Sequence, residues 1–321
     1  MSVKINHVPT DREWKQLTIF GSKKNYFSTE TYFRESFFDG HDVIGENFVN
    51  MMVRTAVVVL KPEVFATRKA SDVISLIEKY NFKLKAFTTV SYDRLKIRET
   101  WRYQYSEATI DRMSLVDHLY CLGDALLLFF EDTSPEITMP ASARLHKLKG
   151  ASEERLRTAD TLRSIIKIPN GVIRLFHIPD EPADIIREIG ILMGRDQRIS
   201  LYSRLNQPSR TTPEQLASTI SGLEAQHPWH DFSLKTAWKN IVEKNNDAMF
   251  SVQMQKLQRQ VEDNQETGWE DVYNLLMENN CDIYDILTIA SYVLKQDVDY
   301  EFHLIDGDAL RGWDATYFKQ M

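Results

Sequence analysis

Between residues 54 and 195, apolar runs of strand length alternate with amphipathic stretches of helix length, and this alternation limits the chain to few folds. Thr55–Leu60 and Ala125–Glu131 are largely apolar, as in buried strands, whereas Phe82–Val90 alternates in polarity like a half-buried strand. Val172–Phe176 follows an Asn-Gly turn and is rich in branched and aromatic residues, which predicts a fourth strand. Helices are expected over residues 71–80, 93–105, 109–122, 141–149 and 180–193.

The order of these elements predicts the class of fold. Strand, helix, strand, two helices, strand, helix, strand and helix fit a four-stranded, largely antiparallel sheet with helices on one face. This is the ferredoxin-like arrangement. We therefore expect residues 54–195 to form an α+β domain of this kind.

The segments on either side of this region have different patterns. Residues 1–53 are rich in aromatic residues but irregular, so we expect this N-terminal extension to pack on a neighbouring surface of the same chain or of a partner subunit. Residues 196–321 are expected to form an all-helical C-terminal domain, with a polar linker at 204–210. Its helices are expected over residues 213–226, 232–246, 248–263, 269–279 and 282–295, before an aromatic tail in which Trp313 and Phe318 dock.

Composition and charge exclude several classes of protein. The chain has 321 residues, 43% hydrophobic and 26% charged, and its net charge of −7 indicates no basic footprint for nucleic acid. The longest apolar run, Ala125–Phe130, is too short to cross a bilayer, and two distant cysteines, Cys121 and Cys281, suggest neither a disulfide framework nor a thiolate metal site. His227 and His230 lack a third partner and indicate a turn rather than a metal site. We expect a cytoplasmic protein with no nucleic-acid or membrane partner.

His177 is the strongest candidate for a reactive residue, because it stands at the junction between the last expected strand and the helix that follows. Asp180 can cap that helix, and Pro182 suits its first turn. Glu188 follows His177 by 11 residues, where a carboxylate on the helix would fix the tautomer and orientation of the ring. The junction would hold a nucleophile or general base rigidly; the alternative is a partly buried histidine satisfied by backbone groups.

The strands of this region resemble, in order, those of the nucleoside diphosphate kinase family. Val57–Glu63 ends its strand in Lys-Pro, like the family's opening strand. Asn81–Leu84 resembles the second strand, and Gly123–Glu131 resembles the third. The resemblance covers residues 54–195 and implies the ferredoxin-like fold that the pattern predicts.

Polar motifs of the family follow in the same order. Thr161-Leu162-Arg163 resembles its Thr-Ile-Arg motif, and His177 follows Arg163 by 14 positions, one more than is usual. Glu188 stands at the spacing of the family's histidine-orienting glutamate. These matches place a cation, a histidine and a carboxylate at positions that the family uses for chemistry.

The resemblance implies a phosphotransferase that uses Mg²⁺ with ATP or another nucleoside triphosphate. His177 would take the γ-phosphoryl group as a phosphohistidine and pass it to a nucleotide or related acceptor in a ping-pong cycle, with Glu188 holding the ring. Lys61 would contact the phosphates, and Arg163 would stabilise the charge that develops during transfer. The nucleotide phosphates, rather than protein ligands, would carry the magnesium ion.

The resemblance also implies further phosphate-binding positions, which it places only to within a few residues. The family's phosphate-contacting tyrosine falls between Tyr103 and Tyr105, and either can serve. Another family arginine falls at His146, with Arg144 close enough to substitute, and the threonine that follows it falls at Ser152.

The chain departs from the family around the histidine. The family's Asn-x-x-His-Gly-Ser-Asp is here Arg174-Leu-Phe-His177-Ile178-Pro179-Asp180. Arg174 can bind phosphate or remain an edge charge, whereas Ile178-Pro179 removes a hydroxyl and a backbone N–H. The family's base-stacking segment is missing, and Ala108–Arg112 takes its place. Phosphate recognition is therefore expected to be partly kept and base recognition to be rebuilt.

These departures leave alternatives open. One is a catalytically weak nucleotide-binding or interaction module, and another is direct transfer of a phosphoryl or nucleotidyl group to a metabolite, with His177 as the base. In purely structural terms, Lys61 would be a strand-end lysine, Arg163 would pair with nearby acids, and Glu188 would be a solvated helix position. Because the added segments could replace the family's subunit contacts, we expect a small homo-oligomer at most, with a homodimer as the candidate.

Overall fold

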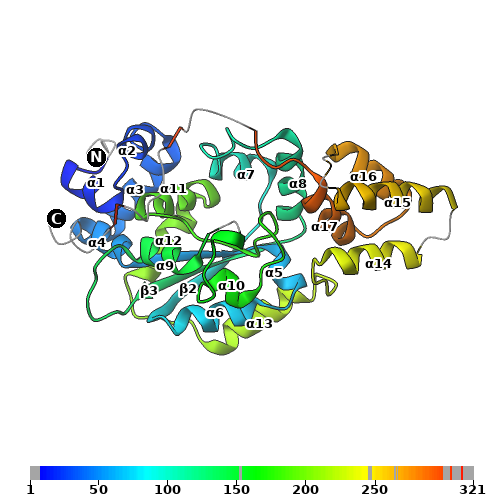
Figure 1. The fold of residues 1–321 in the computed structure, drawn as a ribbon. Helices are drawn as coiled ribbons and strands as arrows, with labels where there is room; N and C mark the ends of the chain where they lie inside the picture. The colour runs from blue at the N-terminus through cyan, green and yellow to red at the C-terminus, as the bar shows by residue number, and fades with distance from the viewer. Residues whose placement is uncertain are drawn as a thin grey trace.

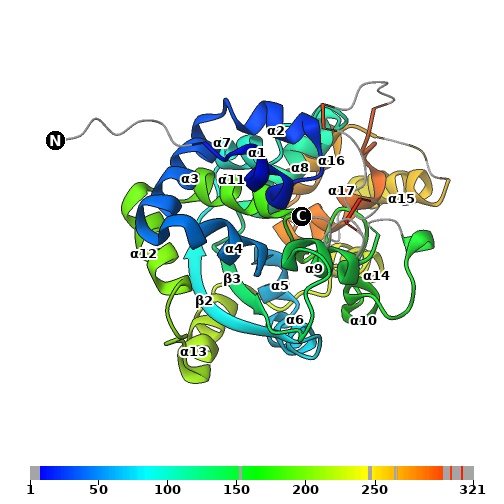
Figure 2. The ribbon, with the colours of Figure 1, turned by 90° about the vertical axis from the view of Figure 1, so that its left-hand side faces the viewer.

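This computed structural model describes residues 8–151, 154–244, 248–263, 265, 267–298, 304–305 and 312–313. A four-stranded sheet lies at the centre of this part of the chain, with helices on both of its faces (Figure 1, Figure 2). The strands are β1 (Thr55–Leu60), β2 (Phe82–Val90), β3 (Ala125–Asp132) and β4 (Phe176–His177), in the order β2-β3-β1-β4. Neighbouring strands are antiparallel throughout, which confirms the expected α+β, ferredoxin-like class.

Two hydrophobic clusters cover the two faces of the sheet, so the expectation that helices cover one face is wrong. Val58 on β1 belongs to one cluster, with α6 (Ala70–Glu78) and α9 (Ala141–Lys149). Val59 belongs to the other, with α3 (Thr31–Ile44) and α11 (Pro182–Leu192). All six residues of β1 are buried as a result, which is why this strand shows no alternation in its sequence.

The remaining helices before residue 206 are mostly short and connect or cover the strands. Two of them, α7 and α8, lie where helices were expected, although α7 ends at Thr100 and turns occupy residues 101–106. Three were not predicted, namely α5, α10 and α12. Their bounds are α5 (Pro62–Ala66), α7 (Arg94–Thr100), α8 (Ile110–Tyr120), a 3₁₀ turn at Glu154–Leu156, α10 (Leu162–Ile166) and α12 (Arg195–Leu205).

The fourth strand is much shorter than Val172–Phe176, which corrects the sequence-based expectation. Asn170 accepts hydrogen bonds from the backbone N–H groups of Val172 and Ile173 through its side chain, at 2.9 Å each, and so holds this segment in a loop. Leu175 then has a positive φ of 62°, which breaks the extended conformation. Only Phe176 and His177 pair with β1.

The N-terminal extension is helical, not irregular as its sequence suggested. It forms α1 (Asp11–Leu17), α2 (Gly21–Phe27), α3, a 3₁₀ turn at Gly45–Asn47 and α4 (Phe48–Val53). Phe33 and Phe37 lie four residues apart on α3 and are fully buried, so α3 packs against α11 of the same chain. The burial of each such phenylalanine stabilises the fold by about 1.5–3 kcal/mol. The expectation that the extension covers a surface of its own chain is confirmed.

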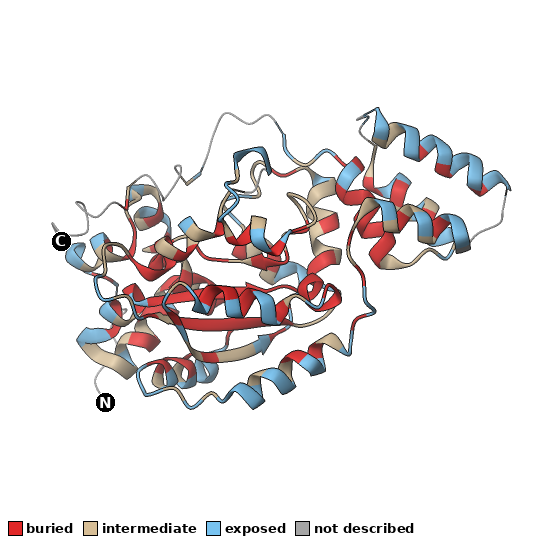
Figure 3. Ribbon diagram, turned by 60° about the horizontal axis from the view of Figure 1, so that its bottom comes forward, coloured by how far each residue is buried: buried red, intermediate tan, exposed pale blue. Residues whose placement is uncertain are grey.

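The C-terminal region contains the helices that its periodicity predicts. They are α13 (Pro213–Glu224), α14 (Leu234–Lys244), α15 (Ala248–Glu262), α16 (Trp269–Glu278) and α17 (Ile283–Val293). Burial coloured on the ribbon shows that α15 is exposed on most of its surface, whereas α17 is largely buried (Figure 3). Trp313 is 1% exposed and so docks as expected, whereas Phe318 lies outside the described residues. The predicted domain boundaries stay a prediction: both hydrophobic clusters include residues on either side of residue 195, and one of them also extends across residue 53.

The two histidines of the His-Pro-Trp-His turn are structural in the described part of the chain. His227 hydrogen-bonds the hydroxyl of Tyr284 at 2.7 Å, and His230 hydrogen-bonds Asp285 at 3.0 Å. Among the described residues, no three His, Cys, Asp or Glu side chains are arranged to hold a metal ion. None of the described helices has the length and apolar character needed to span a bilayer.

Candidate active site

His177 is held at the edge of the sheet by pairing with the central strand. Its backbone lies opposite Val59, and the chain then runs through four residues into α11. Pro182 occupies the first turn of α11 as expected, but the N-cap is Glu181 rather than Asp180. Asp180 therefore keeps its side chain for other contacts, and the junction fixes the backbone on both sides of the imidazole.

Glu188 lies on α11 within hydrogen-bonding distance of His177, as its position in the sequence implied. His177 Nε2 is 2.9 Å from Glu188 Oε1. A carboxylate accepts, so Nε2 carries the proton and Nδ1 carries the lone pair. The imidazole makes a T-shaped contact with Trp101, with the ring centroids 5.4 Å apart. The ring is thus fixed in one tautomer and one orientation.

A cavity of about 320 Å³ opens beside His177. Five of the described residues that line it are cationic, namely Lys61, Arg112, Lys149, Arg163 and Arg174. Aromatic and apolar side chains, including Trp101, Tyr105 and Tyr120, line the rest of its wall. A concave site with several converging cations is suited to a polyanionic ligand.

Two of the arginines predicted from sequence, Arg163 and Arg174, line the cavity and are crowded by like charges. Arg163 is 4% exposed and donates to the carbonyl of Gly150 at 2.7 Å. Burial, followed by the charge of Arg174, lowers the pKa of Arg163. Burial and Arg112 lower the pKa of Arg174. A guanidinium keeps its proton at neutral pH, so these directions indicate a strong positive potential that an anion would relieve.

Lys61 lines the same cavity but has a partner of its own. Its Nζ lies 2.6 Å from Glu63 Oε1 and 5.0 Å from the centre of the Tyr120 ring. Burial lowers the pKa of Lys61, and Glu63 acts in the opposite direction. The ion pair with Glu63 thus opposes the loss of the ammonium's charge at the end of β1, where Pro62 begins α5.

The structure separates the other predicted residues into three groups. Tyr105 and His146 line the cavity, whereas Tyr103 packs against Phe27 with ring centroids 5.8 Å apart. Arg144 is not among the lining residues, because it forms an ion pair with Asp132 at 2.6 Å and stacks on Phe82. We therefore propose Tyr105, rather than Tyr103, as a phosphate-binding residue, and we do not propose this role for Arg144. Ser152 lies outside the described residues.

Sequence reasoning missed two of the five cations. Lys149 lies four residues after Leu145 and seven after Ser142, so it occupies the buried stripe of α9, where a lysine is unusual. Arg112 lies four residues before Val116 and seven before Leu119 on α8, at the same helical spacing. In both helices, a cation at an apolar position of the helical period was the available signal.

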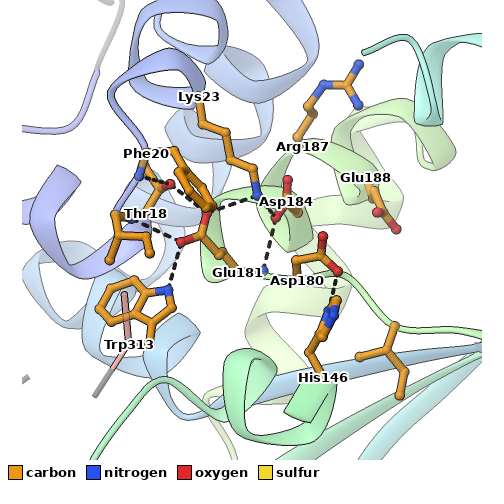
Figure 4. A network of polar contacts seen from close by, with 12 residues as sticks. Thr18, Phe20, Lys23, His146, Asp180, Glu181, Asp184, Arg187, Glu188 and Trp313 are labelled. Carbon is orange, nitrogen blue, oxygen red and sulfur yellow. Dashed lines mark hydrogen bonds and ion pairs between the residues drawn. The ribbon is translucent and has the colours of Figure 1, made fainter. Parts of the chain in front are cut away.

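A second polar cluster lies around Glu181, next to the candidate site (Figure 4). Glu181 is fully buried and its carboxylate accepts four hydrogen bonds or ionic contacts. The donors are Thr18 Oγ1 at 2.6 Å, the Ile19 backbone N–H at 3.0 Å, Trp313 Nε1 at 2.7 Å and Lys23 Nζ at 2.9 Å. We call Glu181, Lys23, Asp184, Thr18 and Trp313 the Glu181 cluster. It joins the N-terminal extension and the described part of the C-terminal tail to the start of α11.

Two carboxylates in this cluster share one lysine. Lys23 Nζ is 2.6 Å from Asp184 Oδ2, and the backbone N–H of Glu181 donates to the same oxygen at 3.0 Å. Burial raises the pKa of Asp184 to about 7, against the effect of Lys23, and the nearby Asp180 and Glu181 add to the rise. The pKa of Lys23 is raised by its carboxylate partners despite its burial. The lysine is therefore firmly charged.

Comparison with known proteins gives a partial likeness in fold. No family model and no curated protein matches the sequence. Solved structures of nucleoside diphosphate kinases align with part of the chain. The enzyme from Encephalitozoon cuniculi has 18% identity and a TM-score of 0.38, covering 44% of this chain and 89% of its own.

Two further structures of this kind give similar values. The nucleoside diphosphate kinase from Aquifex aeolicus has 14% identity and a TM-score of 0.37, covering 44% of this chain and 95% of its own. The NDP kinase from Pyrobaculum aerophilum has 15% identity and a TM-score of 0.35, covering 46% of this chain and 98% of its own. A likeness this low carries no argument about activity or residue roles, which rest on the geometry of the site.

Proposed function

We propose that this protein is a phosphotransferase that moves the γ-phosphoryl group of ATP, or of another nucleoside triphosphate, through a phosphohistidine at His177 to a nucleotide or related acceptor. One observation carries the proposal. A histidine whose Nε2 is bonded to a carboxylate lies on the wall of a cavity with five cationic lining residues. This is the arrangement that transfer of a phosphoryl group to nitrogen requires.

The proposed reaction has two steps, each of which forms one bond and breaks one bond. In the first, the lone pair of His177 Nδ1 attacks the γ-phosphorus, and the bond to the β-phosphate oxygen breaks to release the diphosphate. In the second, an oxygen of the acceptor attacks the same phosphorus, and the P–N bond breaks. Glu188 holds the Nε2 proton in both steps, so the ring remains oriented when Nδ1 is phosphorylated.

The cationic residues neutralise the phosphate oxygens in this scheme. Lys61, Arg163 and Arg174 line the cavity that His177 also lines, so a triphosphate in the cavity can reach all of them. Arginine gives bidentate contacts to phosphate, and lysine acts as a point charge. Tyr105 adds a hydroxyl whose buried oxygen has no hydrogen-bond partner among the described residues.

Magnesium fits this site as a companion of the ligand. Asp180 is the one carboxylate among the described lining residues, and it is bonded to His146. Mg²⁺ prefers oxygen ligands and often takes them from substrate phosphates and water. The nucleotide phosphates would therefore hold the ion, which would neutralise part of their charge when bound.

A second candidate is a nucleotide-binding module with weak or no turnover. Ile178 is fully buried and Pro179 follows it, so neither residue after His177 offers a polar side chain to the cavity. Direct transfer to a metabolite, with His177 as general base, is a third scheme for the same cavity and predicts turnover without a phosphoenzyme.

Labelling with ATP tests the proposed function and separates these schemes. Purified protein is incubated with γ-labelled ATP and magnesium and quenched under alkaline conditions, which preserve phosphohistidine. We expect label on the wild type and on a His41→Ala control, whose histidine lies on α3, and no label on His177→Ala. ATP binding without label or turnover would favour the binding module, and turnover without label would favour direct transfer.

A further inference from the structure

Lys149 lies close to the backbone that follows His177. It ends α9, is 5% exposed, and lines the cavity that His177 also lines. Its Nζ donates to the carbonyl of Ile178, the residue directly after His177, at 3.2 Å. The ammonium is therefore fixed to the same junction that positions the candidate nucleophile.

The ammonium of Lys149 has more donors than its protein neighbours can accept. Nζ is 3.3 Å from His146 Nδ1 and 3.7 Å from Asp180 Oδ1. His146 Nδ1 is bonded to the Asp180 carboxylate (Figure 4), so it carries a proton and has no lone pair for the lysine. The separation from Asp180 exceeds hydrogen-bonding distance. Of three N–H donors, one thus has a full acceptor among the described residues.

Charges around Lys149 favour an anion as the missing acceptor. Arg163 and Arg174 act on it from the other cavity walls, against the opposing effects of Asp180 on the junction and Glu188 on α11. A buried ammonium with unused donors is unstable unless an acceptor completes it. Phosphoryl oxygens provide both the negative charge and the lone pairs.

We infer that Lys149 binds an oxygen of the transferring phosphoryl group beside His177. This inference rests on the proposed function and extends it, because it assigns a catalytic contact to a residue that neither the motifs nor the resemblance indicated. The resemblance gave a phosphate-binding role to His146. Lys149, one turn further along α9, takes this role instead. His146 instead holds Asp180 and so leaves Lys149 free to turn its donors toward the cavity.

This assignment has a consequence for the effect of pH. Burial lowers the pKa of Lys149 to about 8; Asp180 and Glu188 oppose this shift, and Arg163 and Arg174 add to it. The protonated form binds the anion, so the contribution of Lys149 is present below this pKa and is lost as the pH rises through it. The arginines of the cavity stay charged over this range. Lys61 is the other lining lysine, and its pair with Glu63 opposes its deprotonation.

Binding of inorganic tripolyphosphate, measured by calorimetry at about pH 6.5 and about pH 9.5, tests this inference on both sides of the pKa. We expect wild type to lose roughly tenfold in affinity at the higher pH, as one charge-assisted contact implies. Lys149→Arg keeps the tight binding at both pH values. Lys149→Met, which retains the shape without the charge, binds weakly at both.

Two control variants test whether the loss of tripolyphosphate affinity at alkaline pH comes from Lys149. Lys147→Met, on the exposed face of the same helix, keeps the wild-type pH dependence. Lys61→Arg also keeps the alkaline loss, and its disappearance in that variant would assign the effect to Lys61 and overturn the inference. An alkaline loss that persists in Lys149→Arg and Lys149→Met would overturn it as well.

The labelling experiment keeps this inference distinct from the proposed function. Label on His177 without any dependence of tripolyphosphate binding on Lys149 supports the phosphotransferase and rejects the role of Lys149. Absence of label on His177, together with the expected calorimetry, rejects the phosphohistidine and retains Lys149 as a ligand of phosphate.

Discussion

Two groups of charged residues meet at the start of α11 and differ in how far their charges are satisfied. In the Glu181 cluster, each oxygen of the buried Glu181 carboxylate has two partners, and Lys23 lies between two carboxylates. In the cavity beside His177, Lys149, Arg163 and Arg174 all have pKa values lowered by burial. The charges of the Glu181 cluster are therefore paired within the cluster, whereas the cavity beside His177 is short of negative charge.

The difference indicates which of the two groups maintains the fold and which binds a ligand. Buried polar groups in proteins are normally satisfied, and removing a partner then destabilises the folded state. Like charges that face one cavity lower stability and are typical of functional sites. We therefore expect substitutions in the Glu181 cluster to change mainly the free energy of unfolding, and substitutions in the cavity to change mainly ligand affinity.

Removal of Lys23 should have the largest effect on stability. Lys23→Met leaves the buried Glu181 and Asp184 without their shared cation, so we expect a loss of about 3–5 kcal/mol in the free energy of unfolding, measured with urea. Lys24→Met is the matched control, because Lys24 is 44% exposed and its pair with Asp11 lies in solvent. Equal losses of unfolding free energy in the two variants would show that the Glu181 cluster stabilises the fold no more than an exposed ion pair does.

Removal of the indole N–H at Trp313 should have an intermediate effect. Trp313→Phe keeps an aromatic ring but deletes a hydrogen bond to a buried carboxylate, which costs about 1.5–3 kcal/mol in unfolding free energy. Trp229→Phe removes an indole that is 63% exposed and should change stability by less than about 0.5 kcal/mol. An unfolding curve for Trp313→Phe that coincides with wild type would show that the tail does not stabilise α11.

Neutralisation of a cavity arginine should have the smallest effect on stability, with the opposite sign. Arg174→Gln relieves repulsion from Arg112 and Arg163, so we expect the free energy of unfolding to stay the same or rise by up to about 1 kcal/mol. Affinity for tripolyphosphate should fall roughly tenfold in calorimetry. A destabilised Arg174→Gln with unchanged affinity would make this residue part of the scaffold.

The sequence predicts those parts of the fold whose patterns are local. β1, β2 and β3 were recognisable because apolar runs and alternation report burial directly. β4 was overestimated because an asparagine side chain, not the apolar residues after it, decides the conformation of that loop. The N-terminal helices were missed because their polar residues conceal the four-residue spacing of Phe33 and Phe37.

The candidate site was predictable to a similar extent and for the same reason. The spacing of His177 and Glu188 on a strand and the following helix brings them together without help from distant segments. Arg144 was expected at the site but is held away from it by Asp132, which lies 12 residues earlier on β3, and Lys149 was not expected there at all. The Glu181 cluster needs partners 163 and 132 residues away, which no local pattern reveals.

The contact between Trp313 and Glu181 also orders events during synthesis. Thr18 and Lys23 leave the ribosome before Glu181, so they are available as soon as α11 forms, whereas Trp313 is made 132 residues later. At about 5–20 residues per second, that delay is on the order of ten seconds. For this interval the nascent helix that carries Glu188 has its N-terminal partners but not its last donor. The tail is thus the final part of the scaffold behind His177 to be put in place.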